Sequence, residues 1–230
     1  QPKYSFINSD VSGAEALIRW YHPNYGFIPP DNFIPLAEKV DLIHSITAMV
    51  ITTVFSFSQQ VNSISFSINL SGKDFENSTL LNHIDKMAEL YEVNPCRIIF
   101  EITESVMITN PTLALNNLTK LKEKGYKIHI DDFGTGYSSL NYLREFPFDA
   151  IKLDRTFISG IAYDARDLSI VRSIVSLGKA FSLGIVAEGV ENNEQFELLK
   201  NMNCDEFQGY YYSEPLSGDQ LIDFLRGQKK

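Results

Sequence analysis

Two adjacent carboxylates stand at the end of a candidate strand near the middle of the chain. Residues 127–131 alternate polar and apolar side chains, the two-residue period of a β-strand, and Asp131 and Asp132 follow one another where it ends. On an ideal strand these neighbours would point to opposite faces, so a shared role requires the backbone to turn there, as Gly134 and Gly136 would permit. Adjacent carboxylates are stable together mainly when a cation holds them. The alternative is that Asp132 caps the next helix and Asp131 is merely solvated.

More oxygen-bearing side chains lie near the carboxyl ends of other candidate strands. They are Glu15, Asn69, Glu101 and Glu188. Oxygen ligands suit hard divalent cations such as Mg²⁺ or Mn²⁺, whereas structural Zn²⁺ would call for Cys or His. Five acids around one cavity carry more negative charge than one cation needs, which favours two cations with Asp131 as the bridge. Such a pair can activate water and stabilise the attacking and leaving oxygens in phosphoester hydrolysis.

Two basic residues could assist this chemistry. Lys152 could orient the attacking water or neutralise developing charge, and an ion pair with Asp154 is a compatible interpretation. Arg19 is a candidate phosphate contact, with a plain salt bridge as the alternative. Among the histidines only His129 lies on a candidate inward face, where we expect a satisfied core histidine. The chain lacks a Walker loop and a GxGxxG sequence and shows no Ser-His-Asp arrangement, which disfavours an ATPase, a dinucleotide dehydrogenase and a covalent hydrolase.

A fold that gathers several strand ends at one face must position these side chains. Strand candidates fall at 64–69, 98–102, 127–131, 149–153, 184–187 and near Phe207. Amphipathic helical stretches at 80–91, 112–124, 168–181, 194–202 and 218–226 alternate with them. This alternation predicts a parallel sheet of βαβ units, and about eight strands in a chain of this length favour a closed α/β barrel.

The first part of the chain has a different pattern. Residues 1–20 predict two extended pieces around a turn at 8–10. A loop with Gly26, Pro29 and Pro30 follows, then a helix start led by Asp31 and a long apolar helix over 43–60. Because we see no internal linker or repeat, we expect one domain over 1–230.

Composition limits the possible partners and location. The 230 residues carry a net charge of −9, which argues against affinity for a nucleic-acid polymer or anionic lipid. Cys96 and Cys204 show no disulfide or CxxC spacing, so we expect a reducing compartment, the cytoplasm. The apolar run 46–57 is too short to cross a bilayer. The chain does not begin with Met and starts in strand-like sequence, so we expect a domain excised from a longer protein whose parent could be anchored in the inner membrane.

At these residues the sequence resembles the EAL-domain family, the bacterial cyclic di-GMP phosphodiesterases, over essentially the whole chain. The motifs that carry the resemblance are EALIRW at 15–20, FIPLAE at 33–38, NLS at 69–71, EITE at 101–104, DDFGTGYSSL at 131–140, KLD at 152–154, AEGVE at 187–191 and QGY at 208–210. The resemblance implies a TIM-like (β/α)8 barrel with one antiparallel strand near its N-terminus. It also implies hydrolysis of cyclic di-GMP to linear pGpG with two Mg²⁺ or Mn²⁺ ions.

The resemblance assigns roles residue by residue. One cation would be held by Glu15, Asn69, Glu101 and Asp131, and the other by Asp131, Asp132 and Glu188. The implied catalytic residues are Lys152, Glu15 and Asp131. The implied substrate contacts are Gln1, Arg19, Asp154 and Gln208. Glu104 would brace the loop over 133–140, and Glu191 would be a supporting residue. The sequence departs from the family pattern at no metal or catalytic position.

Two other functions remain open at this point. The domain could be a binding module that captures the nucleotide without hydrolysing it, although the complete ligand set argues against this. It could also be a barrel acting on a carbonyl substrate, with Lys152 as base or Schiff-base residue.

The resemblance also suggests partners. Family members often pair through the helix after the Asp131-Asp132 loop, so we expect a homodimer. Tyr137, Leu140, Tyr142 and Leu143 offer apolar material for that contact, and a core role would explain them equally well. The parent chain could carry an N-terminal sensor or GGDEF-type domain.

Overall fold

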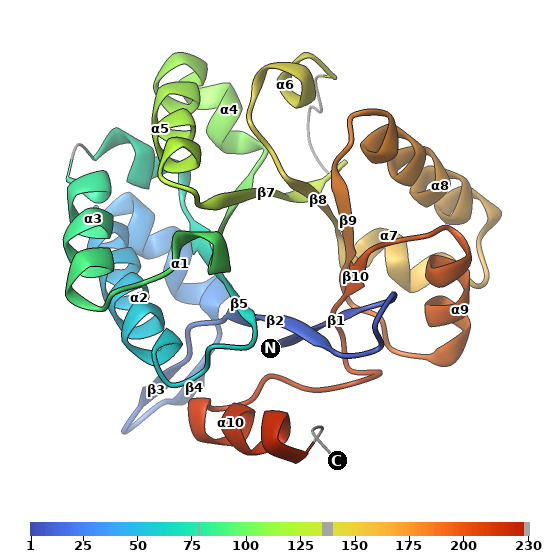
Figure 1. Cartoon of the computed structure of the whole chain (residues 1–230), viewed down its shortest axis with the longest axis horizontal. Coiled ribbons are helices and arrows are strands. Elements are labelled where there is room, and N and C mark those ends of the chain that lie inside the picture. Colours follow the sequence, from blue (N-terminus) through green and yellow to red (C-terminus); the bar gives the residue numbers. More distant parts are fainter. Residues whose placement is uncertain (78, 135–139, 228–230) are drawn as a thin grey trace.

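The computed structural model describes residues 1–77, 79–134 and 140–227, and within them eight strands close into a barrel (Figure 1). In order around the barrel the strands are β1 (Pro2–Ser5), β10 (Glu206–Phe207), β9 (Gly184–Ala187), β8 (Ala150–Leu153), β7 (Lys127–Phe133), β6 (Ile98–Thr103), β5 (Ser65–Leu70) and β2 (Val11–Ala16). β1 pairs antiparallel with both of its neighbours, and the other neighbouring strands of the barrel are parallel. The predicted barrel with one antiparallel strand is therefore confirmed.

Helices surround the barrel on its outside (Figure 1). The longer ones are α1 (Pro30–Lys39), α2 (Ile43–Ser58), α3 (Leu80–Leu90), α5 (Pro111–Glu123), α8 (Ala165–Ala180), α9 (Asn193–Asn201) and α10 (Gly218–Gly227). Shorter turns are α4 (Ser105–Thr109), α6 (Leu140–Glu145), α7 (Arg155–Gly160) and the 3₁₀ segments η1 (Gly72–Glu76) and η2 (Pro95–Arg97). Within the described ranges, no helix combines the length and the apolar composition needed to cross a membrane.

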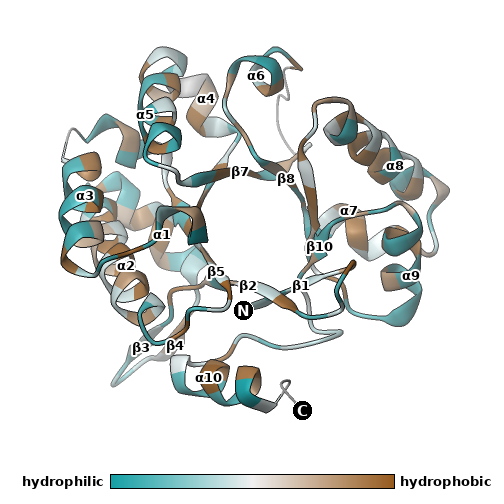
Figure 2. Ribbon diagram, viewed as in Figure 1, coloured by the Kyte–Doolittle hydropathy of each residue, from teal (hydrophilic) through white to brown (hydrophobic). Residues whose placement is uncertain are grey.

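The main core lies between the strands and the surrounding helices, where apolar residues of both are buried (Figure 2). Ile128 and Ile130 of β7 are completely buried there. Burying side chains of this size contributes about 1.5–3 kcal/mol each. Close packing also requires small residues: a Cβ added at Gly178 of α8 would lie only 2.4 Å from the Cδ1 atom of Ile185. The apolar faces thus fix the helices outside and leave the opposite strand faces for polar groups.

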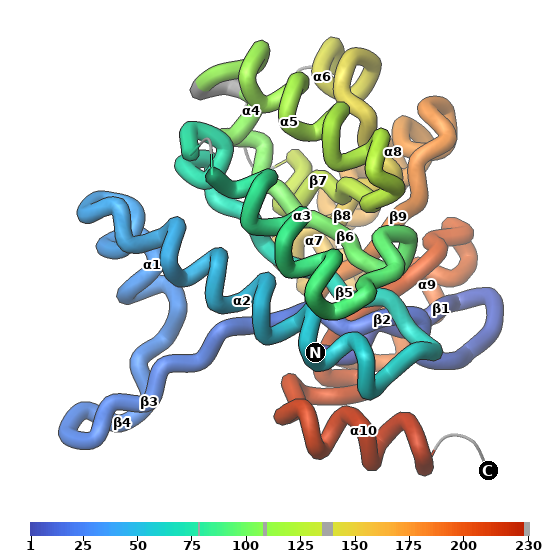
Figure 3. The backbone as a smooth tube through the Cα atoms, turned by 60° about the vertical axis from the view of Figure 1, so that its left-hand side comes forward, coloured from blue at the N-terminus to red at the C-terminus, as the bar shows by residue number. Residues whose placement is uncertain are grey.

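The segment after β2 differs from its prediction. The second extended piece ends at Ala16, and Trp20–His22 and Gly26–Ile28 form a separate hairpin, β3 and β4, where we expected a strand end and a loop. The hairpin lies with α1 away from the barrel (Figure 3). Its three-residue strands carry exposed aromatic residues and are too short to give a periodic signal. The ring of Trp20 contacts Phe33 of α1 edge-on at 5.4 Å, which ties the two elements together.

Candidate active site

The backbone at the end of β7 brings two neighbouring carboxylates to the same side. Asp132 has a φ of +52°, in the left-handed region that Asp tolerates better than most residues, and the register with β8 shifts between Ile130 and Phe133. The Asp132 amide donates to Asp131 Oδ1 at 2.9 Å. The expected turn therefore occurs at Asp132 itself, before Gly134, while β7 continues to Phe133. The predicted turn at Gly134 and Gly136 is corrected in this respect; Gly136 lies outside the described residues.

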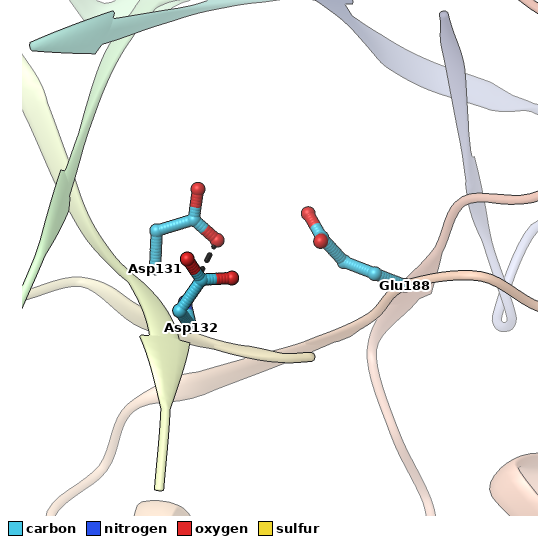
Figure 4. A group of neighbouring side chains, drawn as sticks. All are labelled: Asp131, Asp132 and Glu188. Carbon is cyan, nitrogen blue, oxygen red and sulfur yellow. Dashed lines mark hydrogen bonds between the residues drawn. The ribbon is translucent and has the colours of Figure 1, made fainter. Parts of the chain in front are cut away.

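Glu188, just after β9, faces this pair (Figure 4). One carboxylate oxygen from each of Asp131, Asp132 and Glu188 lies within 4.8 Å of the others. Such a spacing allows three oxygens to share one cation, and oxygen ligands suit Mg²⁺ or Mn²⁺. The described residues thus contain a candidate cation site at the predicted position.

The Lys152 ammonium occupies the centre of the barrel mouth and is 1% exposed. Its Nζ lies 2.6 Å from Glu101 Oε2, 2.6 Å from Glu188 Oε1, 3.1 Å from Asp131 Oδ2 and 3.7 Å from Glu15 Oε2. We call Lys152 and its four carboxylate partners, together with Asp132, the acid ring. The interpretation of Lys152 as paired with Asp154 is wrong, because within the described residues its ammonium forms ion pairs with the ring carboxylates and not with Asp154.

Amide side chains extend the ring on the side of β2. Asn69 Nδ2 donates to Glu15 Oε1 at 2.7 Å, and Gln208 Nε2 donates to Glu15 Oε2 at 2.8 Å. Gln208 Nε2 also reaches Gln1 Oε1 at 2.9 Å. The side-chain amide oxygen of Gln208, Oε1, is buried and has no hydrogen-bond partner among the described residues. Glu15, Asn69, Gln1 and Gln208 therefore meet as the sequence predicts, with an acceptor left available.

The electrostatics of the ring reflect its excess of acid. Burial raises the pKa of Glu188 to about 8, and that of Asp131 to about 6, against the opposing Lys152 ammonium. Burial and the Asp154 carboxylate raise the pKa of Asp132. These three carboxylates are the ones clustered as a candidate cation site. The Lys152 ammonium, with that of Lys3 beside Glu101, is therefore too little positive charge for the five carboxylates of the ring.

Lys152 and Glu101 are the charged pair at its centre. Burial lowers the pKa of Lys152, but Glu101, Glu15 and the other ring acids outweigh burial and raise that pKa well above its ordinary value. Burial pushes the pKa of Glu101 upward, and the ammoniums of Lys152 and Lys3 outweigh it and hold the pKa below its usual range. Lys152 is thus a permanent cation at neutral pH, and Glu101 a permanent anion.

The remaining predicted residues lie around the ring in different ways. Asp154 caps α7 by accepting the Thr156 amide hydrogen at 2.9 Å, and its carboxylate interacts with Asp132. Glu104 Oε1 accepts the Gly134 amide hydrogen at 2.8 Å, the contact that its predicted bracing role requires. Residues 135–139 of that loop lie outside the described ranges.

Two predicted residues, Arg19 and Glu191, are exposed and lie outside the ring. Arg19, in the loop after β2, donates a hydrogen bond to the Ile18 carbonyl oxygen at 3.0 Å. Its guanidinium forms no ion pair with any of the described residues. Glu191 pairs with Arg155 at 2.6 Å, with both side chains largely exposed. Both residues lie in segments that follow strands carrying ring residues, but within the described part of the chain neither forms a hydrogen bond or ion pair with a ring residue.

Two further buried residues, His129 and Lys3, lie close to the ring acid Glu101, and neither was assigned to the site from the sequence. His129 is buried, and burial with the nearby Lys3 ammonium lowers its pKa to about 3, so the imidazole is neutral. Its Nδ1 has no partner among the described residues, so the prediction of a satisfied histidine is wrong for that atom. Lys3, which we did not predict, contacts Glu101 at 3.2 Å. A lysine between apolar residues in an N-terminal strand was the available signal.

Two cavities adjoin the ring. One of about 640 Å³ is lined by Gln1, Glu15 and Arg19 together with residues of α2 and the start of α10. The other, of about 300 Å³, is lined by Arg19, Asn69 and Glu101 and by residues of α1 and α2. Residues 16–19 line both cavities. The two cavities therefore share the segment that carries Arg19, and each is lined by at least one residue of the acid ring, Glu15 or Glu101.

Comparison with known proteins gives the context for this geometry. The sequence profile described as EAL domain matches residues 1–215. Two relatives from Pseudomonas aeruginosa are the cyclic di-GMP phosphodiesterase RocR, 33% identical over 99% of this chain and 59% of its own length, and the bifunctional diguanylate cyclase/cyclic di-GMP phosphodiesterase MucR, 38% identical over 96% of this chain and 33% of its own. The chain thus spans between about a third and three fifths of the length of these relatives.

Solved structures agree with the sequence comparison. The PaMucR phosphodiesterase in complex with cyclic di-GMP superposes with a TM-score of 0.92 at 38% identity, covering 96% of this chain and 92% of the other. The EAL enzyme Bd1971 in its form with bound cAMP and cyclic di-GMP gives a TM-score of 0.94 at 29% identity, covering 98% of this chain and 63% of the other. With the profile match over 1–215, these findings show that the chain belongs to the EAL domain family.

Proposed function

We propose that the domain formed by residues 1–230 hydrolyses cyclic di-GMP to linear pGpG with two divalent cations, Mg²⁺ or Mn²⁺. The observation that carries the proposal is the acid ring, in which four of the five carboxylates contact the buried Lys152 ammonium and Glu101 also pairs with the buried Lys3 ammonium. Relatives named as cyclic di-GMP phosphodiesterases support the choice of substrate. A buried excess of acid is costly unless cations offset it, so the site fits a metal-dependent function.

The donor set suits two cations. Asp131, Asp132 and Glu188 would hold one of them, since their oxygens already converge. Glu15, Asn69, Glu101 and Asp131 would hold the other; the Asn69 amide nitrogen donates to Glu15, which leaves its carbonyl oxygen as a ligand. When bound, such cations supply positive charge to the attacking and leaving oxygens of a phosphodiester and lower the pKa of water.

Lys152 acts as a fixed cation in this proposal. Its ammonium is held by four carboxylates, which raise its pKa well above the ordinary value. It can donate hydrogen bonds, which orient a water molecule and stabilise the negative charge that develops on phosphate oxygens. Glu15 and Asp131 complete the catalytic set by holding Lys152 and the cations in one arrangement.

The cavities beside the ring would receive the substrate. Arg19 lines both cavities, and the N–H groups of its exposed, planar guanidinium would bind a phosphate. Gln1 and Gln208 are hydrogen-bonded to each other beside Glu15. The side-chain oxygen Oε1 of Gln208, which has no partner among the described residues, can accept a hydrogen bond from a ligand. Asp154, which interacts with Asp132, would also contact the substrate. Glu104 and Glu191 would support the loops around the site.

The direct test is a nucleotide assay. The purified protein is incubated with cyclic di-GMP and Mg²⁺, Mn²⁺ or Ca²⁺, and the products are separated by chromatography. We expect pGpG with Mg²⁺ or Mn²⁺. No linear product, under conditions where a known phosphodiesterase of the family is active, would contradict the proposal. Tight nucleotide binding with Ca²⁺ but no turnover with Mg²⁺ or Mn²⁺ would instead support the binding module.

The carbonyl-substrate alternative depends on a neutral Lys152 amine. The ring acids keep the pKa of Lys152 well above its ordinary value, which disfavours attack on a carbonyl carbon. Failure of borohydride to trap a covalent adduct would remove the Schiff-base version of this alternative.

We also propose that the domain is part of a longer signalling protein, with a sensor or GGDEF-type domain, and that it forms a homodimer through α6. Leu140 is 57% exposed on α6, whereas Leu143 is buried and Tyr142 packs against the core. Tyr137 lies outside the described residues. A monomer at high concentration in light scattering would contradict the dimer.

A further inference from the structure

A second buried lysine lies beneath the acid ring. Lys3 of β1 is completely buried, and its ammonium contacts the Ser67 hydroxyl of β5 and lies 3.2 Å from Glu101 Oε1 of β6. A buried ammonium is costly unless it is paired and hydrogen-bonded, so the contacts with Ser67 and Glu101 offset the cost of burying Lys3. Among the described residues, the Lys3 ammonium has one carboxylate partner, Glu101, and one hydroxyl partner, Ser67.

The antiparallel strand supplies this ammonium. Tyr4 turns outward and stacks near Phe207 with a ring separation of 5.6 Å, so Lys3, its neighbour, turns into the barrel. Lys3 pairs with Gly13 of β2, and a Cβ at that position would lie 3.2 Å from Lys3 Cε and 2.6 Å from Ser65 Oγ. Glycine at position 13 therefore leaves the space that the lysine side chain fills.

Each carboxylate oxygen of Glu101 is paired with a different lysine. Glu101 Oε1 lies 3.2 Å from Lys3, and Glu101 Oε2 lies 2.6 Å from Lys152 in the ring. Because both carboxylate oxygens have a charged partner and Glu101 is fully buried, its carboxylate is held in one orientation. Only Oε2 is directed toward the ring, where Glu101 would bind a cation.

We propose that Lys3 is a positioning residue, which holds Glu101 Oε1 beneath the ring so that Oε2 is presented to the cation site. The inference rests on the proposed metal-dependent function. Groups that orient a metal ligand typically change metal affinity or activity 10–100-fold when they are replaced. Lys3 would act in this way although it touches neither cation nor substrate.

The test measures Mn²⁺ binding to the purified protein by electron paramagnetic resonance of free Mn²⁺, without nucleotide. We expect Lys3→Met to weaken binding about 10–100-fold. The matched control is Lys122→Met, which removes an ammonium 2.6 Å from Asp149 at the other end of β8 and should leave Mn²⁺ affinity unchanged. Equal weakening in the two variants would indicate general loosening of the barrel and overturn the proposal.

A double-variant comparison separates positioning from loss of stability. If Lys3 acts through Glu101, Lys3→Met should weaken Mn²⁺ binding no further in a protein that already carries Glu101→Gln. A further loss of the same size in that background would overturn the proposal. If Lys3→Met does not fold, Lys3→Gln replaces it: we expect clearly weaker binding, because the amide is shorter and uncharged, and unchanged binding would overturn the role of the ammonium.

Mn²⁺ binding to the unaltered protein distinguishes failure of the proposed function from failure of the proposed role of Lys3. Absence of any Mn²⁺ binding to it would overturn the proposed function and, with it, the role of Lys3. Tight Mn²⁺ binding that Lys3→Met leaves unchanged would overturn the role of Lys3 and leave the proposed function intact.

Discussion

The two ends of strand β8 carry the same kinds of charged residue in different proportions. Just before the strand, Lys122 Nζ lies 2.6 Å from Asp149 Oδ1, and the other Asp149 oxygen accepts the Ile128 amide hydrogen at 2.7 Å. Toward its carboxyl end, Lys152 contacts four carboxylates. The shortest Lys152 distances are also 2.6 Å, so distance does not distinguish the two clusters.

Burial and charge balance do distinguish them. Lys122 and Asp149 are 31% and 29% exposed and balance one charge with one, whereas Lys152 is 1% exposed among an excess of acids. Water can screen the first cluster, which links α5 to the start of β8. Solvent screens the second cluster poorly, because Lys152 and Glu101 are buried, and unpaired negative charge is costly there. The charges of Lys122 and Asp149 balance one another. The acid ring keeps an excess of negative charge that bound cations would offset.

The largest expected difference between the ends of β8 is in catalysis. Glu15→Ala should abolish pGpG formation, because Glu15 contacts Lys152, Asn69 and Gln208 and is a proposed cation ligand. Asp149→Asn should leave turnover of the folded protein near the unaltered level. Initial rates with Mg²⁺, measured by chromatography, check both variants. Substantial residual turnover in Glu15→Ala would refute its role as a ligand.

The next difference is in the free energy of unfolding. Lys152→Met leaves several buried carboxylates without their cation, and breaking a buried pair in this way costs about 3–5 kcal/mol. Lys122→Met removes one partner of a partly exposed pair and should cost about 1 kcal/mol or less. Urea unfolding of both metal-free proteins measures these values. Equal losses would contradict the idea that the acid ring depends on positive charge.

Cation binding should stabilise the carboxyl end of the barrel selectively. At a free Mn²⁺ concentration a hundred times the dissociation constant, the free energy of unfolding should rise by about 2.7 kcal/mol, and chelation with EDTA should reverse the gain. The gain should persist in Lys122→Met and shrink in Glu188→Gln, which weakens the cluster of Asp131, Asp132 and Glu188. Thermal unfolding with and without Mn²⁺ tests this, and no shift in the unaltered protein would contradict the cation site.

Much of this contrast could be predicted from alternation along the strands. The strands at 98–102, 127–131 and 184–187 were predicted to within two residues, because each lies between strongly amphipathic helices. In a parallel barrel the carboxyl ends of the strands meet at one face, so polar residues at those ends had to converge. Convergence of Glu101, Asp131 and Glu188 around Lys152 follows from that rule.

Distances across the barrel could not be predicted in the same way. Alternation shows which face a side chain occupies but not the register between strands, which decides which carboxylates of the other strands reach Lys152. The positive φ of Asp132 was hidden because the nearby glycines offered a simpler place for the turn. Lys3 lies on the antiparallel strand, where the rule for parallel strand ends does not apply.

The smallest expected effect belongs to a third lysine pair, Lys124 with Asp85, which links α5 to α3. Its ion-pair distance is 2.5 Å, similar to those at both ends of β8, but its side chains are 37% and 48% exposed. If distance determined the energy of these pairs, Lys124→Met would cost as much as Lys152→Met. Because solvent screens an exposed pair, we expect a coupling energy of only about 0.2–1 kcal/mol from a double-mutant cycle with Asp85→Asn, measured by urea unfolding. A coupling energy above about 2 kcal/mol would contradict burial and charge excess as the source of the difference, since exposed pairs rarely exceed about 1 kcal/mol.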